Sequence, residues 1–218
     1  MLKAISRSVL SFVFPISCEL CGEVLPSGND GGVCFSCESS IPLTAPAYSE
    51  HKDFHFDRVF AACYYEDKVK TLLCSFKFRR NRALRPTLLR LLKQRLEGQD
   101  TNRWDALAAV PMPMGKKLER GFNQAELLAR GVAALLEKPY LKNVLTLTGA
   151  PQQQAKLSKA RRRENVKRLF RASDRVAGKN IFLVDDILTT GETTSECARA
   201  LKESGAKLVD ILVVARGR

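Results

Sequence analysis

From Arg58 onward, the hydrophobic positions alternate between short continuous runs and runs with helical spacing. Continuous apolar runs predict buried strands, whereas apolar residues three and four positions apart predict amphipathic helices. The expected strands cover 59–65, 107–110, 144–147, 181–184 and 208–214. The expected helices cover 69–76, 84–92, 125–136 and 191–204. Strands that alternate with helices predict an α/β fold, in which helices cover both faces of a parallel sheet.

The segment before Arg58 has few apolar residues but two pairs of cysteines. The pairs are Cys18-x₂-Cys21 and Cys34-x₂-Cys37, with twelve residues between them. Each pair can place two thiolates on one turn, and two such turns can close the tetrahedral four-sulfur site that zinc prefers. The pattern therefore predicts a closed, structural zinc site that supplies much of the folding free energy of this module. The alternatives are two disulfides, which need an oxidising compartment, and a redox-active cysteine pair.

These patterns divide the chain into three parts. Residues 1–44 would hold a short N-terminal helix and the zinc module, 45–57 a linker, and 58–218 the α/β domain. The apolar run near the N-terminus is too short for a convincing signal peptide. No stretch approaches the ~20 apolar residues that span a bilayer. We therefore expect a cytoplasmic protein without a transmembrane segment.

The stretch from Ile181 to Thr193 joins an apolar run, two acids and a loop of small residues before a helix. Backbone N–H groups of 189–193 can converge at a helix N-terminus, where a phosphate is favoured. The carboxylates of Asp185 and Asp186 can accept hydrogen bonds from ribose hydroxyls and attract Mg²⁺ carried with the ligand. The alternative is a buried strand that leads into an ordinary helix, with two acids favoured by its dipole.

This stretch resembles the signature of type I phosphoribosyltransferases, which is the binding loop for phosphoribosyl pyrophosphate (PRPP). The resemblance covers all thirteen positions from 181 to 193. It implies that Asp185 and Asp186 are the catalytic groups of any enzymatic reaction. It also implies a PRPP site composed of Asp185, Asp186, Ile187, Leu188, Thr189, Thr190, Gly191, Glu192 and Thr193.

Two further motifs lie between the cysteines and this signature. The first is Pro111-x-Pro113 followed by Arg120-Gly121-Phe122-Asn123-Gln124. The second is the stretch from Gln154 to Val166, which is rich in lysine and arginine. In this order, from about Cys18 to Arg216, the motifs resemble those of the ComF/GntX family. The resemblance implies a type I phosphoribosyltransferase-like parallel sheet flanked by helices, with a small N-terminal Cys₄ zinc-finger module. It also implies a pyrophosphate-side loop with Pro111, Arg120 and Gln154, although 146–151 lacks basic residues that many relatives carry.

Members of this family are associated with DNA uptake in bacterial competence. The resemblance therefore implies a natural-transformation protein that binds PRPP with Mg²⁺ and single-stranded DNA, beside a competence helicase and DNA-processing proteins. The alternative is a metabolic phosphoribosyltransferase that transfers phosphoribose from PRPP to a base or amine. The sequence contains no recognisable base-reading element, which favours the first interpretation and leaves catalytic turnover open.

The formal net charge of +13 favours polyanionic ligands over a generic basic surface. Basic residues concentrate in 68–95 and 156–175, with Phe76, Phe78 and Phe170 among them. A cationic groove with occasional aromatic residues suits sequence-tolerant binding of single-stranded DNA. The predicted DNA contacts are Lys77, Arg79, Arg80, Arg82, Arg161, Arg162, Arg163, Lys167 and Arg168.

Overall fold

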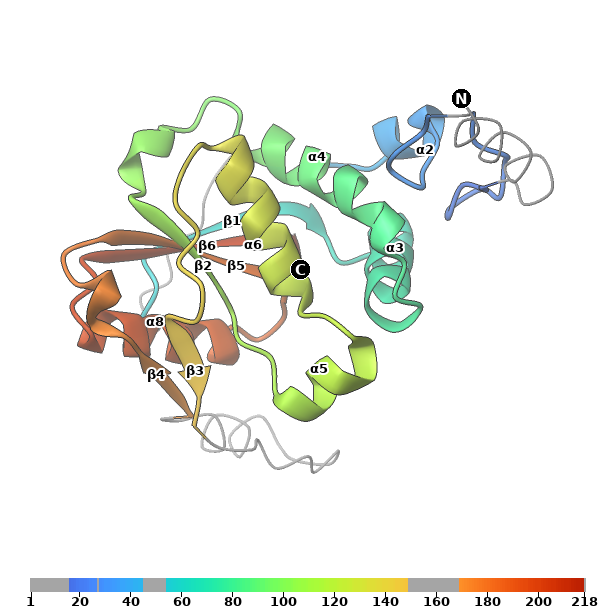
Figure 1. Cartoon of the computed structure of the whole chain (residues 1–218). Helices are drawn as coiled ribbons and strands as arrows, with labels where there is room; N and C mark the ends of the chain where they lie inside the picture. Colours follow the sequence, from blue (N-terminus) through green and yellow to red (C-terminus); the bar gives the residue numbers. More distant parts are fainter. Residues whose placement is uncertain (1–15, 27, 45–53, 149–168, 218) are drawn as a thin grey trace, which may run out of the picture.

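The computed structural model describes residues 16–26, 28–44, 54–148 and 169–217. Its centre is a four-stranded parallel sheet with the strand order β1-β6-β5-β2 (Figure 1). The strands of this sheet are β1 (Arg58–Tyr64), β2 (Ala106–Ala109), β5 (Asn180–Leu188) and β6 (Leu208–Arg216). The prediction of a parallel sheet in an α/β fold is confirmed.

Helices cover both faces of this sheet (Figure 1). One face carries α4 (Arg85–Leu96) and α6 (Gln124–Leu135), and the other carries α8 (Glu192–Glu203). Phe182 and Val184 of β5 are buried on the α4–α6 side, whereas Ile181 and Leu183 are buried on the α8 side. A strand buried on both faces needs apolar residues at every position, which explains the unbroken apolar run at the start of β5.

Three aromatic rings pack together near the N-terminal ends of the strands β1, β2 and β5. The rings of Trp104 and Phe182 are stacked with centroids 3.8 Å apart, and Phe60 meets both edge-on. The indole Nε1 of Trp104 donates to the carboxylate of the buried Asp210 at 2.9 Å, and Arg103 donates to the same oxygen at 2.8 Å. Trp104 therefore serves packing, because its ring and its polar atom are both engaged in the core.

A second, antiparallel sheet consists of β3 (Leu145–Leu147) and β4 (Phe170–Ala172). This hairpin packs against α8. The sequence predicted β3 but not its antiparallel partner, because a strand as short as β4 carries too few positions for a recognisable pattern. A parallel bridge between Leu107 and Tyr140 also extends the main sheet beyond β2.

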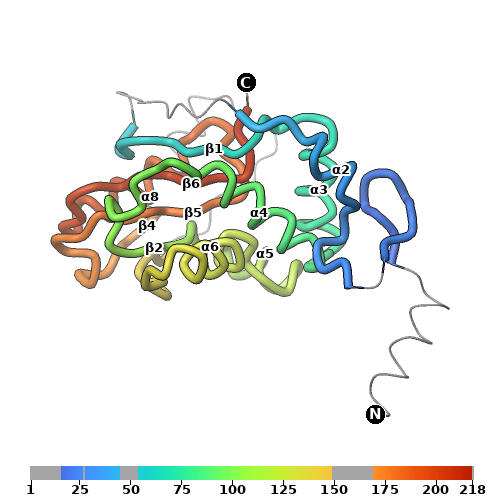
Figure 2. The backbone as a smooth tube through the Cα atoms, turned by 90° about the horizontal axis from the view of Figure 1, so that it is seen from above, coloured from blue at the N-terminus to red at the C-terminus, as the bar shows by residue number. Residues whose placement is uncertain are grey.

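The cysteine-rich segment docks on the outer side of α3 (Asp67–Phe78) and α4 (Figure 2). It contains the short helix α2 (Phe35–Ser39). Arg90 of α4 donates to Glu38 at 2.6 Å, and Thr87 donates to the carbonyl oxygen of Gly31 at 3.0 Å. A Cβ atom at Gly31 would collide with Thr87 and Arg90, so the close approach requires glycine there.

The remaining elements connect these layers. Leu43 forms an antiparallel bridge with Cys63 of β1, and Phe56, within the predicted linker, is buried beside the α8-side core. The helix α5 (Met114–Arg120) was not predicted, because it has no buried residue and therefore no apolar periodicity. The 3₁₀ helices are η1 (Arg82–Leu84), η2 (Thr101–Arg103) and η3 (Asp174–Val176). Within the described part of the chain, every helix is too short or too polar to cross a membrane.

Candidate functional site

The chain leaves the neighbouring strands β2 and β5 in opposite directions. After β2 it passes through α5 and α6 on one face, whereas after β5 it passes through α8 on the other face to β6 (Figure 1). In open α/β sheets, ligands bind in the crevice that forms where the loops of adjacent strands diverge in this way. The segments 110–113 and 189–191 follow β2 and β5 at the place where such a crevice is expected. The N–H of Val110 donates to the carbonyl oxygen of Val184 at 3.0 Å between the two strands.

The structure corrects the predicted end of the strand that precedes the acids. The apolar run predicted a strand that ends at Val184, with the acids in a loop, but β5 continues to Leu188. Asp185, Ile187 and Leu188 all have partners in β6. The run of apolar residues stops at the acids, whereas the backbone pairing does not, so hydrophobicity alone could not locate the end. Only residues 189–191 separate β5 from α8.

The two acids are not equivalent. By the two-residue period of a strand, Asp185 shares the α8 side with Leu183, and Asp186 shares the opposite side with Val184. The Oδ2 atom of Asp186 lies 2.9 Å from Nζ of Lys77. The backbone N–H of Asp186 donates to Oδ1 of Asp185 at 2.8 Å. Burial, and then the nearby charge of Asp186, raise the pKa of Asp185 to about 8. Without a ligand, Asp186 is therefore a carboxylate paired with a lysine, whereas Asp185 is a carboxyl group that keeps its proton up to about pH 8.

The loop after β5 leads directly into the first turn of α8. Gly191 is the N-cap residue with φ 80°, and a Cβ atom there would lie 3.1 Å from the ring of Phe54. The carbonyl oxygen of Gly191 accepts hydrogen bonds from the N–H of Ser195 and the hydroxyl of Thr194. Thr189, Thr190 and Thr193 are exposed. Three hydroxyls and the first-turn N–H groups, which have no partner within a helix, are thus present at this helix end.

Ile187, Leu188 and Glu192 were also predicted to contact PRPP, but they are half-buried rather than exposed. Ile187 packs against the α4–α6-side core and Leu188 against the α8-side core. The two side chains help to hold the strand in place, and their contact with PRPP stays a prediction.

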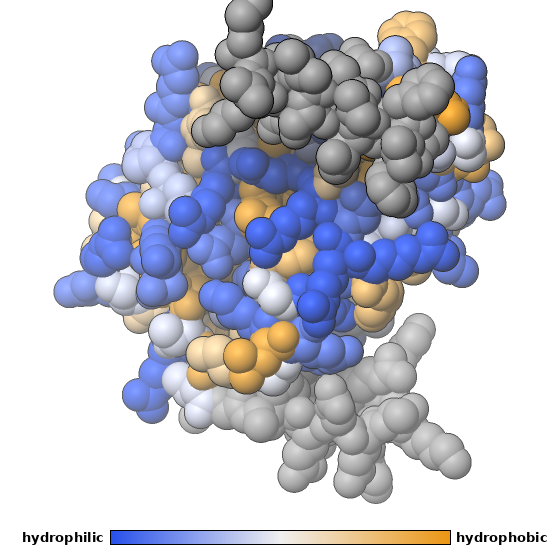
Figure 3. All heavy atoms as spheres, turned by 45° about the vertical axis from the view of Figure 1, so that its right-hand side comes forward, coloured by the Kyte–Doolittle hydropathy of each residue, from blue (hydrophilic) through white to orange (hydrophobic). Residues whose placement is uncertain are grey.

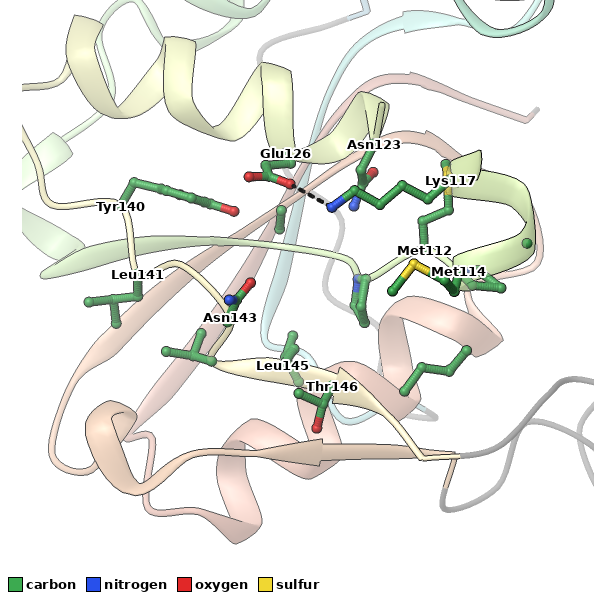
Figure 4. A pocket seen from close by; sticks show the side chains of 16 residues that line it. Met112, Met114, Lys117, Asn123, Glu126, Tyr140, Leu141, Asn143, Leu145 and Thr146 are labelled. Carbon is green, nitrogen blue, oxygen red and sulfur yellow. Dashed lines mark ion pairs between the residues drawn. The ribbon is translucent and has the colours of Figure 1, made fainter. Parts of the chain in front are cut away.

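A pocket of about 550 Å³ opens beside the end of β2 (Figure 4). Pro111, Met112, Pro113 and Met114 line one side of it. Its polar side chains come from α5, from the N-cap and first turn of α6, from the segment before β3 and from β3 itself, and they are Lys117, Asn123, Glu126, Tyr140, Asn143 and Thr146. Figure 4 shows that Lys117, Glu126 and Tyr140 point toward one another.

The polar groups of the pocket are held by contacts with one another. Glu126 lies 3.7 Å from Nζ of Lys117 and 2.7 Å from a guanidinium nitrogen of Arg130. Burial and the Glu126 charge raise the pKa of Tyr140 to about 12, so its hydroxyl remains a donor. Asn123 donates to the carbonyl oxygen of Val110 and caps α6, which fixes the loop after β2 against that helix. No sequence motif marks Glu126, Tyr140 or Asn143, because only the fold brings them together.

The residues predicted for the pyrophosphate side are not all brought together. Pro111 lines the pocket, but Arg120 is not among the lining residues. The guanidinium of Arg120 instead lies 4.9 Å from the centroid of the Phe78 ring and donates to Gln124 at 3.4 Å. Gln154 lies outside the described residues.

Four predicted DNA contacts lie together at the end of α3, in a stretch that we call the basic segment, residues 77–82. Arg79 pairs with Glu19 of the cysteine module at 3.2 Å. Arg80 donates to the carbonyl oxygen of Glu119, and Arg82 donates to that of Gly121. The remaining predicted contacts lie outside the described residues, and they are Arg161, Arg162, Arg163, Lys167 and Arg168.

The four predicted metal ligands converge. The sulfur atoms of Cys18, Cys21, Cys34 and Cys37 all lie within 4.8 Å of one another, and all seven cysteines of the chain are free of disulfides. The N–H of Cys34 donates to the sulfur of Cys18 at 3.3 Å, and the N–H of Cys37 donates to that of Cys34 at 3.4 Å. Four convergent sulfurs with backbone donors form the type of closed donor set that a structural zinc ion takes.

Without a cation, these thiols differ in acidity. Although burial opposes it, hydrogen bonds from backbone N–H groups lower the pKa of Cys18 to about 6. Burial and the neighbouring thiols raise the pKa of Cys37 to about 12. Four thiolates so close together repel one another, so they ionise together only around a cation. The other cysteines lie outside the cluster, with Cys63 and Cys197 fully buried and Cys74 half-buried.

The family of the chain follows from comparison with known proteins. The family model of the phosphoribosyl transferase domain matches residues 89–218, which include β2, β5 and the loop from β5 to α8. The chain belongs to the phosphoribosyl transferase domain family. The match also confirms the predicted fold class, because the matched region contains the sheet from β2 to β6 and its covering helices α6 and α8.

Two curated relatives support the predicted resemblance to ComF. The DNA utilization protein YhgH of Escherichia coli (strain K12) is 29% identical, over 93% of this chain and 97% of its own. Competence protein F of Haemophilus influenzae is 29% identical, over 84% of each chain. This phosphoribosyl transferase domain protein is therefore ComF-like. Among solved structures, a crystal structure of adenine phosphoribosyltransferase matches with a TM-score of 0.42 and 19% identity, over 64% of this chain and 73% of that one.

The raised pKa of Asp185 predicts a dependence of stability on pH. Between its ordinary value of 3.8 and about 8, the folded protein keeps a proton that the unfolded chain releases. The contribution of this group to stability therefore falls as the pH rises through that window. We expect Asp185→Asn to raise the melting temperature relative to wild type by an amount that grows from about pH 4 to about pH 8.

Asp174→Asn is the matched control, because it makes the same change at an exposed side chain in the turn before β5. Its melting temperature should differ from that of wild type by the same small amount at both pH values. A difference between Asp185→Asn and wild type that does not change with pH would show that Asp185 is not held protonated.

Proposed function

We propose that this ComF-like phosphoribosyl transferase domain protein binds PRPP, or a closely related sugar phosphate, together with Mg²⁺. We further propose that it binds single-stranded DNA in competence-type DNA uptake. The single observation that carries the sugar-phosphate site is the divergence of the chain to opposite faces of the sheet at the ends of β2 and β5. There, two acids and three exposed threonines surround the N-terminus of α8. The relatives named for competence and for DNA utilization support the choice of DNA as the second ligand.

Each part of the ligand has a matching group at these strand ends. The 5′-phosphate would meet the N–H groups and hydroxyls of 189–193, since a helix N-terminus favours anions. The ribose hydroxyls would donate to Asp185 and Asp186, and the hydrogen bonds to Asp186, which is paired with a lysine as a carboxylate, would be charge-assisted and therefore strong. Mg²⁺ brought by the ligand would offset the negative charge of the pyrophosphate and of these carboxylates.

Replacing both acids tests this site. In Asp185→Ala with Asp186→Ala, the ribose loses both acceptors, so we expect affinity for Mg²⁺–PRPP to fall about a hundredfold or more. Calorimetric titration of the purified protein measures the affinity, and circular dichroism checks the fold. The control is Asp174→Ala, whose side chain lies in the turn before β5 and should leave the affinity unchanged. Undiminished affinity in a folded double variant would remove the proposal.

A metabolic phosphoribosyltransferase is the second candidate, and the pocket beside β2 is the observation that favours it. Lys117, Glu126 and Tyr140 offer hydrogen-bond donors and acceptors within one hollow, next to the loop that follows β2. Such a set suits the edge of an acceptor molecule. In that reaction the acids would stabilise the ribose as positive charge develops on it. Release of pyrophosphate from Mg²⁺–PRPP on addition of a nucleobase would support this candidate, and binding without release would favour the competence function.

The basic segment has the features of a sequence-tolerant surface for single strands. The side chain of Arg79 is 78% exposed, and the neighbouring Phe78 is 64% exposed. Arg120 stacks its guanidinium over the ring of Phe78, which keeps a flat aromatic face next to positive charge. Figure 3 shows the side of the molecule with α3 and α5, where hydrophilic surface is interspersed with apolar side chains. Phe76, in contrast, is fully buried and belongs to the core.

Two substitutions separate the expected contributions to DNA binding. Phe78→Ala should weaken binding of a single-stranded oligonucleotide by roughly 1–3 kcal/mol, the typical stacking contribution of one base, without changing the salt dependence. Arg79→Ala should instead reduce the salt dependence by about one phosphate contact. Fluorescence anisotropy at several salt concentrations measures both effects.

The matched control for Phe78→Ala is Phe35→Ala, because Phe35 is 87% exposed on α2 and lies outside the basic segment. Phe35→Ala should leave the affinity for the oligonucleotide unchanged. Equal affinities of the Phe78 and Phe35 variants would show that this surface does not stack bases.

We also propose that the four clustered cysteines bind one structural zinc ion. Cys37→Ser removes one of the four ligands, so we expect loss of bound zinc and a lower melting temperature. Cys74→Ser is the control, since Cys74 lies outside the cluster, and it should retain one zinc per chain. Metal content is measured by atomic emission. Zinc-free wild-type protein with an unchanged melting temperature would contradict the proposal.

A further inference from the structure

Lys77 connects the acids at the end of β5 with the basic segment. It lies in the last turn of α3, directly before Phe78 and Arg79. Its Nζ atom is 2.9 Å from Oδ2 of Asp186, and the two side chains are only 16% and 10% exposed. Among the described residues, Lys77 is the cation paired with Asp186. One ion pair therefore joins the proposed sugar-phosphate site to the proposed nucleic-acid surface.

The other cations of the basic segment are held by different elements. Arg79 pairs with Glu19 of the cysteine module, and Arg80 and Arg82 donate to carbonyl oxygens at the end of α5. Asn81 also donates to Glu19 at 3.0 Å. These contacts hold the basic segment in place without involving Asp185 or Asp186. Among the described residues, Lys77 is the one cation of the basic segment that forms an ion pair with an acid at the end of β5.

A ligand that uses Asp186 would compete with Lys77 for the same carboxylate. Ribose hydroxyls and the divalent cation of a sugar phosphate are attracted to the same carboxylate oxygens. A divalent cation close to an ammonium group is strongly repelled by it where the surroundings are partly buried. A lysine ammonium is a compact charge on a flexible stem, so it can change partner without movement of the helix.

We propose that Lys77 exchanges between Asp186 and a phosphate of a bound single strand, so that the sugar phosphate and single-stranded DNA promote each other's binding. This inference rests on the proposed function, because it requires both ligands. When Asp186 accepts the ligand, the ammonium of Lys77 becomes available beside Arg79. When a DNA phosphate takes the ammonium, Asp186 becomes available to the sugar phosphate. Such a coupling is reciprocal, with the same factor in both directions.

The experiment measures the affinity for a fluorescent oligothymidine by anisotropy, with and without saturating Mg²⁺–PRPP. For the wild type we expect the sugar phosphate to tighten DNA binding by about fivefold or more, the lower end of typical couplings. The slope of log affinity against log salt should steepen by about 0.7, which corresponds to one added phosphate contact on a single strand.

Lys77→Met removes the ammonium while keeping a long side chain. In this variant, we expect no coupling, a salt slope that does not respond to Mg²⁺–PRPP, and affinity for Mg²⁺–PRPP alone that equals or exceeds that of the wild type. Lys70→Met is the matched control, since Lys70 is exposed on the same helix, and it should retain the full coupling. Lys77→Arg keeps a cation beside Asp186 and should retain part of the coupling.

The outcomes separate the two levels of the proposal. If Lys77→Met shows the same coupling factor as the wild type, or if the wild type binds both ligands with no coupling, the exchange of Lys77 is wrong while the proposed function stands. If the wild type binds no Mg²⁺–PRPP, the proposed function itself fails. Coupling that is present in the wild type, Lys70→Met and Lys77→Arg and absent in Lys77→Met supports the inference.

Discussion

The position of the site depends on the pairing of β5 between β2 and β6. This strand is buried on both faces along its first part, and the same backbone ladder continues past the end of the apolar run at Val184, through Asp185 to Leu188. The ladder thereby holds the side chains of Asp185 and Asp186 in fixed positions near the C-terminal end of β5. Burial of ionisable groups at such a place is costly. The raised pKa of Asp185 and the ion pair of Asp186 are two different responses to this cost.

The same ion pair joins parts of the molecule that are distant in sequence. Through Lys77, Asp186 is connected to α3, and through Arg79 and Asn81 the end of α3 is connected to Glu19 of the cysteine module. Folding of that module around a metal would therefore position the basic segment as well as the module itself. This arrangement would give the small N-terminal module a role at the proposed DNA-binding surface, in addition to holding the proposed structural zinc ion.

Much of the fold followed from the sequence because its signals are local. The apolar runs of β1, β5 and β6 and the amphipathic helices α3, α4 and α6 carry their own pattern. The paired cysteines and the Asp185-to-Thr193 stretch combine residue types that packing alone does not require. The extension of β5, the exposed helix α5 and the short strand β4 escaped prediction, because backbone pairing and surface position leave no apolar period. The contact between Lys77 and Asp186, and the pocket around Glu126 and Tyr140, arise from tertiary packing and have no sequence signature.

The most direct test of the account is a crystal structure of the zinc-loaded protein with Mg²⁺–PRPP bound. We expect the 5′-phosphate to lie at residues 189–193 and the ribose hydroxyls at Asp185 and Asp186. We also expect the ammonium of Lys77 to have moved away from Asp186. Electron density for the ligand at another place on the protein, or a bound ligand at the ends of β2 and β5 that makes no contact with either acid, would contradict the account.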